Sequence, residues 1–339
     1  MRENTQFEAR RERSVASNAL RIRLTTIHEG LIFRPMTLSR IVCCALLCGV
    51  LLLGACRAPS GNVAMRPVTD DIGRQLEVPA SIDRIVTFAP SVTELVYAAG
   101  AGHKLVGVTT VDDYPPEIEA LPRFDALPLD FEAILALEPD IAIASEQVNN
   151  PNDAATLASL GVPVYFLAVQ TFQGLPETIR RAGSLLATES AANRMADSLE
   201  SSMKALRTVM AGASSRPTTL FLIGDEVLYA FGKGSHIHDL IALAGGESLT
   251  ASFSNRAPIL SDEYVLLARP DVIVGAFGED YDPTRLLHIH PTWDLVPAVR
   301  NGRVYGLDGH LYLRPGPRLV EGAWRLAARL HPSMFRQAP

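Results

Sequence analysis

The chain contains one segment twice, and this duplication limits what it can fold into. Residues 132–145 read EAILALEPDIAIAS, and residues 263–276 read EYVLLARPDVIVGA. In each copy a glutamate is followed seven positions later by Pro-Asp, and Pro-Asp is followed by a short apolar run. The first part has the pattern of a helix and the last part the pattern of a buried strand. We therefore expect two related α/β units in one chain.

The rest of the body, residues 84–331, alternates strands and helices in the same way. Strands are expected at 84–88, 105–109, 140–144 and 162–167, and again at 219–223, 271–275 and 304–306. Helices are expected at 92–99, 131–137 and 152–160, and again at 238–244, 263–268, 292–296 and 318–330. Such alternation predicts parallel sheets with helices packed against them.

Residues 188–210 interrupt this alternation. Met195, Leu199, Met203, Leu206 and Met210 recur at steps of three or four residues, which is an apolar stripe with helical period. The segment predicts a helix of about 23 residues, about 35 Å long. The expected fold class is α/β, with two lobes of parallel-rich sheets joined by one long backbone helix. Ligands of such sheets bind beyond the carboxyl ends of the strands, which predicts a ligand cleft between the lobes.

The first 56 residues have a different character from the body. A short basic start at Met36 leads to 13 apolar residues, 41–53, and then to Gly54-Ala55-Cys56. A membrane-spanning helix needs about 20 apolar residues, so the run is typical of a secretory signal peptide. The order Leu, Gly, Ala, Cys also resembles the bacterial lipobox, whose cysteine receives a lipid. We expect an exported protein anchored through Cys56 to the bacterial cell membrane, facing the periplasm or the outer surface.

These observations predict a division of the whole chain. Residues 1–35 are interpreted as an upstream over-read, because Met36 starts the signal pattern. Residues 36–56 are the predicted lipoprotein signal peptide, and 57–68 a flexible tether. Residues 69–187 are the predicted N-terminal lobe, 188–211 the backbone helix and 212–339 the C-terminal lobe.

Composition excludes several functions for residues 57–339. They carry 23 basic and 33 acidic side chains, and an acidic body argues against a nucleic-acid partner. They contain no cysteine, so a disulfide, a catalytic thiol or a cysteine-based zinc site is excluded there. Gly232-Lys233-Gly234-Ser235 resembles half of a phosphate loop, but Val227 stands where that loop needs its first glycine. We predict no catalytic residue, no intrinsic cofactor and no enzyme activity; an exported α/β enzyme is the alternative.

Several segments of the body carry a resemblance to a known family: RIVTFAPSVTELVYAAG, VGVTTVDDYPPE, the two repeated segments, LASLGVPV, VPAVRNGRVYGLDG and RPGPRLVEG. On these segments the body resembles the periplasmic binding proteins of ABC importers for vitamin B12, iron-siderophores and haem, which have a helical backbone. DDYPPE and Arg-Pro-Gly-Pro-Arg make the vitamin B12 binders the most similar group. The resemblance implies a monomer that captures a corrinoid or iron chelate and delivers it to a permease dimer with its ATPase. Haem- and siderophore-binding proteins of the same fold are the alternatives.

The resemblance also gives the repeated glutamate a role. In this family one surface carboxylate on each lobe contacts arginines of the permease, and the matching residues here are Glu132 and Glu263. Two exposed anions far apart suit a two-fold symmetric basic partner and favour its orientation and encounter. The alternative is that each glutamate only stabilises the N-terminus of its own helix.

The ligand-binding residues are less clearly marked. Aromatic residues hold the corrin in the vitamin B12 binders, whereas the matched positions here are Val111, Ala126, Ser145 and Ala257. Tyrosine or histidine can ligate haem iron, and arginine pairs with carboxylate, phosphate or catecholate groups. The predicted ligand-binding residues on the cleft loops are Ser91, Tyr114, Tyr229, Arg256, His310, Tyr312 and Arg314.

Two His-x-His pairs raise the alternative of a metal-ion carrier. In a strand the members of such a pair face one way and can bind zinc. However, His238 and His290 lie at predicted helix starts, where this geometry is lost. No metal site is therefore predicted.

Overall fold

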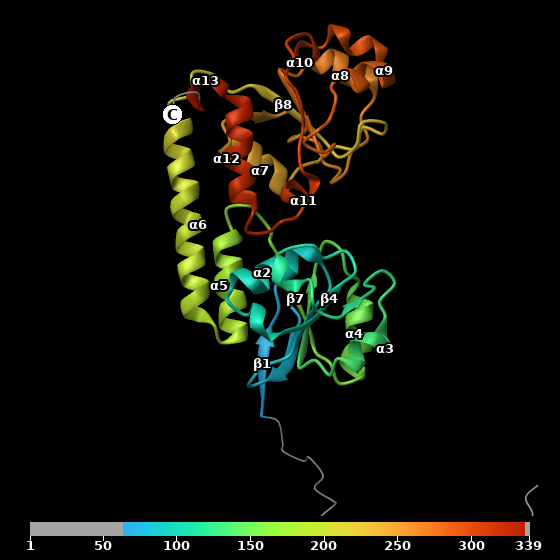
Figure 1. Ribbon diagram of the computed structural model, residues 1–339, viewed down its shortest axis with the longest axis vertical. Helices are drawn as coiled ribbons and strands as arrows, with labels where there is room; N and C mark the ends of the chain where they lie inside the picture. Colours follow the sequence, from blue (N-terminus) through green and yellow to red (C-terminus); the bar gives the residue numbers. More distant parts are fainter. Residues whose placement is uncertain (1–63, 336–339) are drawn as a thin grey trace, which may run out of the picture. The chain divides into compact units, whose positions relative to one another are not determined.

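The computed structural model describes residues 64–335 (Figure 1). All of these residues belong to one compact unit. The predictions for residues 1–35, for the signal peptide with Cys56, and for the start of the tether lie outside the described residues. Among residues 64–335, no helix combines the length and the apolar character needed to cross a bilayer.

The N-terminal lobe is built on a five-stranded sheet with the strand order β5-β4-β3-β6-β7, all pairs parallel. Its strands are β3 (Ile85–Thr87), β4 (Leu105–Thr109), β5 (Arg123–Phe124), β6 (Ile141–Ser145) and β7 (Val164–Leu167). Its helices are α2 (Pro90–Ala98), η2 (Gly102–Lys104), η3 (Pro116–Ile118), α3 (Phe131–Ala136), α4 (Pro151–Ser159) and α5 (Leu175–Leu186). Every residue of β6 is buried, as expected when helices cover both faces of a parallel sheet.

A hairpin that the sequence did not predict precedes this lobe. Strands β1 (Met65–Thr69) and β2 (Gln75–Pro79) pair antiparallel. Asp71 at the turn accepts two hydrogen bonds of 2.9 Å from the guanidinium of Arg181 on α5. The end of the predicted tether, 65–68, is therefore a strand tied to the lobe.

The C-terminal lobe repeats the parallel architecture with four strands in the order β11-β10-β8-β9. The strands are β8 (Thr218–Leu222), β9 (Glu247–Ser248), β10 (Val272–Gly275) and β11 (Val304–Gly306). The first helices are α7 (His236–Leu243), α8 (Asp262–Ala268), α9 (Thr284–Ile289) and η4 (Pro291–Leu295). The last are α10 (Pro297–Arg300), α11 (Gly309–Tyr312), α12 (Leu319–Leu330) and α13 (Pro332–Phe335).

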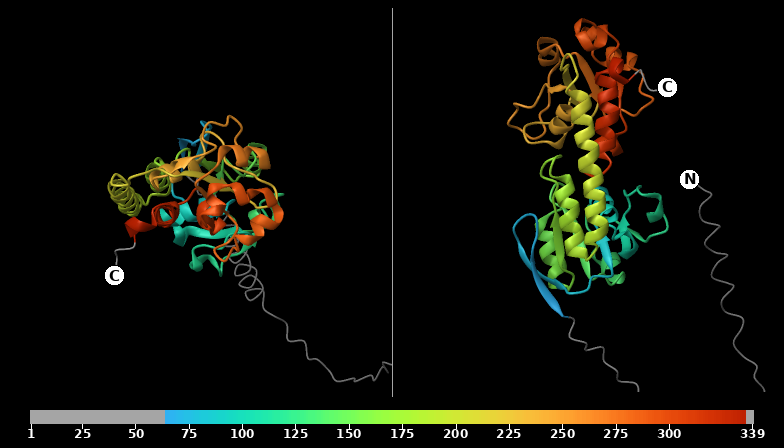
Figure 2. Two further views of the ribbon diagram at one scale, coloured as in Figure 1. Left: turned by 90° about the horizontal axis from the view of Figure 1, so that it is seen from above. Right: turned by 90° about the vertical axis from the view of Figure 1, so that its left-hand side faces the viewer.

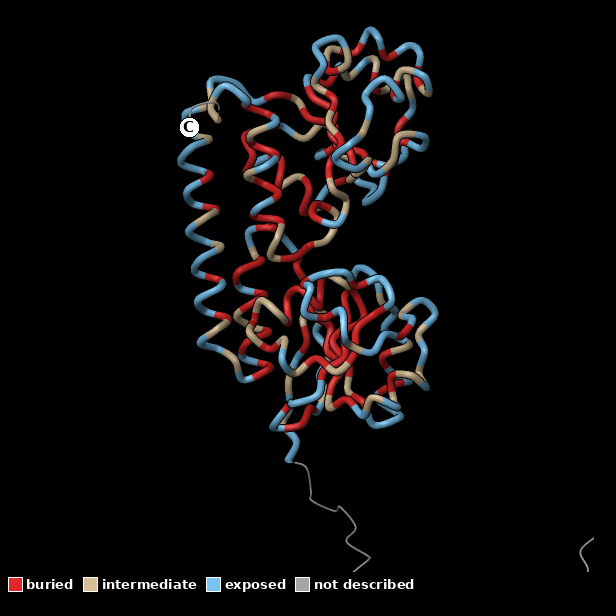
Figure 3. The backbone as a smooth tube through the Cα atoms, in the orientation of Figure 1, coloured by how far each residue is buried: buried red, intermediate tan, exposed pale blue. Residues whose placement is uncertain are grey.

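One long helix, α6 (Glu189–Met210), runs beside both lobes, and α12 runs beside it in the C-terminal lobe (Figure 2). Its buried residues Ala192, Ala196, Met203 and Leu206 form one face, and its outer face is exposed (Figure 3). A continuous apolar cluster extends from Ile85 and Leu95 in the N-terminal lobe, along α5 and α6, to α7 and α12. The predicted fold class, two α/β lobes and a long backbone helix, is confirmed.

The two repeated segments adopt the same local structure. In each, a capping side chain accepts a hydrogen bond from the first turn of the helix: Asp130 from the amide of Ala133 at 3.0 Å, and Ser261 from that of Tyr264 at 3.2 Å. Each helix is followed by a residue in the left-handed region, with φ 45° at Glu138 and 51° at Arg269. Pro-Asp and the parallel strand, β6 or β10, come next.

Candidate functional site

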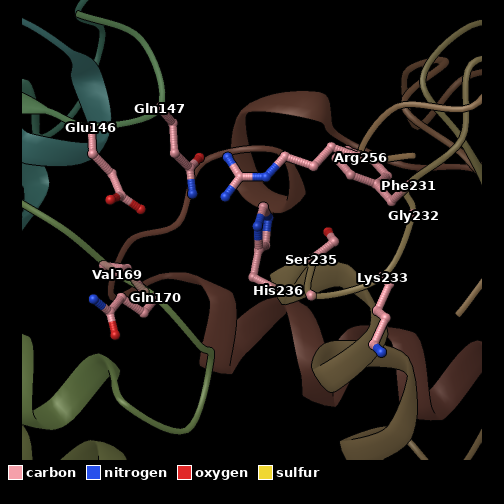
Figure 4. A pocket seen from close by; sticks show the side chains of 11 residues that line it. Glu146, Gln147, Val169, Gln170, Phe231, Gly232, Lys233, Ser235, His236 and Arg256 are labelled. Carbon is pink, nitrogen blue, oxygen red and sulfur yellow. The ribbon is translucent and has the colours of Figure 1, made fainter. Parts of the chain in front are cut away.

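The loops at the carboxyl ends of the two sheets enclose a cavity of about 220 Å³ (Figure 4). Such a position is expected, because the strand order reverses at β3 and β6 in one sheet and at β8 and β10 in the other. Glu146 and Gln147 follow β6, and Val169 and Gln170 follow β7. The C-terminal lobe contributes Phe231, Gly232, Lys233, Gly234, Ser235, His236 and Arg256. The cavity is therefore lined by both lobes.

Two cations, Lys233 and Arg256, lie on the C-terminal side of this cavity, and the guanidinium of Arg256 extends toward Gln147 (Figure 4). Within the described part of the chain neither makes an ion pair. Their loops are bound together, because the amide of Gly232 donates to the Arg256 carbonyl at 2.9 Å. A Cβ at Gly232 would lie 1.6 Å from the Asn255 carbonyl, so this approach requires glycine. The pair supplies positive charge for an anionic ligand group.

His236 begins α7 at the floor of the same cavity and is 7% exposed. Its Nε2 donates to the Tyr312 carbonyl at 3.2 Å. Burial lowers the pKa of His236 below the ordinary value, although this hydrogen bond acts in the opposite direction. The histidine is therefore neutral at pH 7.

Several large apolar side chains are exposed on the loops at this end of both sheets. In the N-terminal lobe these are Val111, Tyr114, Leu127 and Val148, and in the C-terminal lobe Ile223, Val227, Tyr229 and Ile259. Exposed apolar surface on facing loops marks a site for a ligand or partner. Most of these side chains are aliphatic, so stacking on aromatic rings is limited here.

The predicted ligand-binding residues differ in how near they lie to the cavity. Arg256 lines the cavity, and Tyr229, 42% exposed, lies on the neighbouring loop after β8. Ser91 is buried in the first turn of α2. Tyr114 is partly exposed, but the guanidinium of Arg318 lies 4.1 Å from its ring centre.

Of the seven predicted ligand-binding residues only Arg256 lines this cavity, and His310, Tyr312 and Arg314 are held by other contacts. Tyr312 is only 1% exposed, because its ring packs 6.3 Å from that of Phe221, inside the apolar core. Arg314 donates two hydrogen bonds to Asp113, and the Nδ1 of His310 lies 2.6 Å from the same carboxylate. Sequence alone could not reveal these partners, since Asp113 and Arg314 are 201 positions apart.

Apart from Arg256, none of the residues that line the cavity was predicted; the polar ones among them include Glu146, Gln147, Gln170 and Lys233. The first three directly follow the predicted strands 140–144 and 162–167. Their position after two strand ends was the signal that could have found them. Lys233 was considered only as part of an incomplete phosphate loop.

Glu132 and Glu263 occupy equivalent, exposed places in the first turns of α3 and α8. Both helices lie on the side of the body away from α6 (Figure 1). Hydrogen bonds from its own backbone amide and from the Ser261 hydroxyl hold the pKa of Glu263 below its usual value. The arrangement presents one carboxylate on each lobe.

The two repeated aspartates, Asp140 and Asp271, bind backbone groups at the start of each sheet. Asp140 accepts hydrogen bonds from the amides of Asp83 and Arg84, at 2.7 and 2.8 Å, just before β3. Asp271 accepts from the amide and the hydroxyl of Thr218 at 2.9 Å, where β8 begins. Each Pro-Asp therefore joins its own strand to the first strand of the same sheet.

Among residues 64–335, no group of three or more metal-ligating side chains occurs, and the histidines of the two pairs are bound by other partners. His238 is bound by Ser248 Oγ at 2.7 Å and by the Gly232 carbonyl at 2.6 Å. His290 lies 2.7 Å from Asp262 and 2.8 Å from the Asp225 carbonyl, and it stacks on Trp293. Both pairs include a helix start, where neighbours two residues apart point in different directions.

The chain was compared with protein-family profiles, with known proteins and with solved structures. The profile of the family described as "Periplasmic binding protein" matches residues 85–311. The uncharacterized ABC transporter substrate-binding lipoprotein YvrC of Bacillus subtilis is 26% identical over 309 residues, which is 86% of this chain and 97% of YvrC. The vitamin B12-binding protein of Vibrio cholerae is 29% identical over 258 residues, 75% of this chain and 91% of that protein.

A solved structure with the same fold is that of the periplasmic heme-binding protein RhuT from Roseiflexus sp. RS-1. Its TM-score is 0.67 at 29% sequence identity, and the match covers 75% of this chain and 100% of RhuT.

Proposed function

Because the chain belongs to the periplasmic binding protein family, we propose that it is the substrate-binding protein of an ABC importer. It captures a metal chelate between its lobes and delivers it to the permease. The observation that carries the proposal is the cavity lined by both lobes, with Lys233 and Arg256 free of ion pairs among the described residues. No catalytic role is assigned to any residue.

The ligand class follows from the walls of the cleft. Exposed aliphatic side chains favour a ligand with apolar edges, and the two cations favour one that also carries carboxylate, phosphate or catecholate. A corrinoid, haem and a ferric siderophore all combine these properties. Tyr229 is an exposed phenol on these loops that is available to haem iron.

A thermal-shift panel tests the function. The purified protein is heated with cobalamin, cobinamide, haemin, a ferric catecholate, a ferric hydroxamate and zinc chloride. A ligand at 100 times its Kd stabilises the fold by about 2.7 kcal/mol, which gives a clear rise in Tm. We expect a rise with one metal chelate. A response to zinc alone would favour a metal-ion carrier, and turnover of a bound compound would favour an enzyme.

We further propose that the protein acts as a monomer, held at the membrane by a lipid on Cys56, and that Glu132 and Glu263 contact the two permease subunits. Equivalent exposed positions on two lobes support this assignment. The variant Glu132→Arg/Glu263→Arg should lose uptake in cells while its ligand affinity stays unchanged. Uptake at the wild-type rate would show that both glutamates only stabilise the N-termini of their own helices. A Cys56→Ser variant should appear in the soluble fraction and incorporate no labelled palmitate.

A further inference from the structure

Two carboxylates of the N-terminal lobe meet two arginines of the C-terminal lobe. Glu94 on α2 accepts hydrogen bonds from Arg318, at 2.7 Å from Nη2 and 3.0 Å from Nε. Asp113, in the loop after β4, accepts from both terminal nitrogens of Arg314, one of them at 3.2 Å. Arg314 Nη1 also lies 3.9 Å from Glu94 Oε1. We call these four residues the inter-lobe salt-bridge cluster.

The local sequence explains how one loop presents both arginines. Arg314 and Arg318 are the ends of the run Arg-Pro-Gly-Pro-Arg, and the two prolines fix φ on either side of Gly316. A Cβ at Gly316 would lie 3.0 Å from Glu94 Oε2, so the loop lies directly against the carboxylate of the other lobe. The run is a stiff support that holds both guanidinium groups toward the N-terminal lobe.

Burial makes these contacts strong. The side chain of Glu94 is 2% exposed, and those of Arg314 and Arg318 are 16% and 19% exposed. A charge in such surroundings is stable only with its partner, and separating the pair leaves both groups unsatisfied. Burial raises the pKa of Glu94 even though the guanidinium of Arg318 acts to lower it.

The cluster is separate from the ligand cavity, because none of its four residues is among those that line it. It joins the lobes directly, whereas α6 runs along one side of both (Figure 1). A further direct contact between the lobes is the Phe172 amide, which donates to Asp239 at 3.1 Å. We propose that the inter-lobe salt-bridge cluster sets the separation of the two lobes and so the width of the cleft.

Spin labels on the two lobes test the proposal without any ligand. Ala136 and Leu267 occupy the same place in the two repeated segments, and both are exposed. They are changed to cysteine in the full chain, with Cys43, Cys44, Cys48 and Cys56 replaced by serine so that only the labelled positions react. The distance between labels is measured by pulsed electron spin resonance in the parent protein, in Glu94→Gln and in Asp113→Asn.

We expect one narrow distance distribution in the parent, and a longer mean distance with a broader distribution in each variant. The matched control is Glu279→Gln, which removes an exposed ion pair of Arg325 within the C-terminal lobe and should leave the distribution unchanged. Distributions that match the parent in both variants, with native circular dichroism, would overturn the proposal. If Glu94→Gln does not fold, the more exposed Asp113→Asn decides the question alone. The measurement is independent of ligand binding, so the proposed function and this inference can fail separately.

Discussion

At the scale of single residues, the site depends on side chains whose state is set by partners far away in the sequence. Arg314 and Arg256 look alike as exposed loop arginines in the sequence, yet one is bound by Asp113 and the other lines the cavity. The contact with Arg314 keeps Asp113 ionised. Partial burial would raise the pKa of Asp113, but the hydrogen bond and the charge of Arg314 lower it below the usual value.

His236 gives a prediction at this scale about pH. Because burial lowers its pKa in the folded state, the unfolded chain binds more protons as the pH falls below 6.5. Wild-type stability should therefore decrease from pH 6.5 toward the lowered pKa, relative to His236→Gln, by up to about 1.4 kcal/mol per pH unit. Urea unfolding of both proteins between pH 5 and 8 measures this difference.

Other titrating groups, including buried Glu94 with its raised pKa, are common to wild type and variant and cancel in that comparison. Parallel curves for the two proteins across this range would show that His236 does not titrate differently on folding.

At the scale of elements, the repeated segment carries two separable roles. Its glutamate is exposed in the first turn of the helix, and its aspartate binds backbone groups where the first strand of each sheet begins. Part of the duplication therefore has a structural reason: in each half the aspartate of the repeat holds the start of the first strand of its sheet.

The anchoring role predicts a loss of stability for Asp140→Ala and Asp271→Ala. Each substitution removes two hydrogen bonds to a carboxylate, and we expect each to lower the free energy of unfolding by about 1.5–3 kcal/mol. Chemical denaturation measures the change. The exposed Asp280→Ala, whose carboxylate makes no hydrogen bond or ion pair among the described residues, is the control and should have a much smaller effect. Equal losses in all three variants would contradict the anchoring role.

The elements were largely predictable from sequence. The strand at 105–109 and that at 304–306 have the predicted bounds, because each is an apolar run flanked by turn residues. The hairpin β1–β2 was not predicted, since Met65–Thr69 and Gln75–Pro79 are short, half-exposed strands with a weak apolar pattern. Helix α5 was also missed, although its apolar face packs against α6.

The site was less predictable than the elements. Tyr229 lies on the loop after the predicted strand 219–223, and Arg256 is the predicted residue that lines the cavity. Burial of Tyr312 and the capture of Arg314 by Asp113 depend on how the lobes meet, and no local pattern encodes that. The apolar stripe predicted for α6 is buried only in part: Met203 is buried, whereas Met195 is exposed.

At the scale of the whole molecule, the two lobes share one apolar core. The cluster that includes Ile85, Ile179, Leu206, Ile241 and Leu326 crosses from one lobe to the other through α5 and α6. The lobes therefore cannot lose their packing independently. This continuity, together with the inter-lobe salt-bridge cluster, fits a binding protein whose lobes move little.

A shared core predicts cooperative unfolding of residues 64–335. Differential scanning calorimetry should give one transition with a van't Hoff enthalpy close to the calorimetric enthalpy. Two resolved transitions, one for each lobe, would contradict the shared core.

The most direct test of the central claim is a titration followed by absorbance, with cyanocobalamin, haemin, a ferric catecholate and a ferric hydroxamate as probes. One of them should saturate the wild-type protein at one equivalent and remain chemically unchanged. The Arg256→Glu variant should bind that probe at least about tenfold more weakly, since a charged hydrogen bond contributes about 1.5–3 kcal/mol and about 1.4 kcal/mol is tenfold in Kd. The control Arg325→Glu, on the outer surface, should bind normally. Failure of all four chelates to saturate the protein, or equal affinity of Arg256→Glu and wild type, would contradict capture of a metal chelate between the lobes.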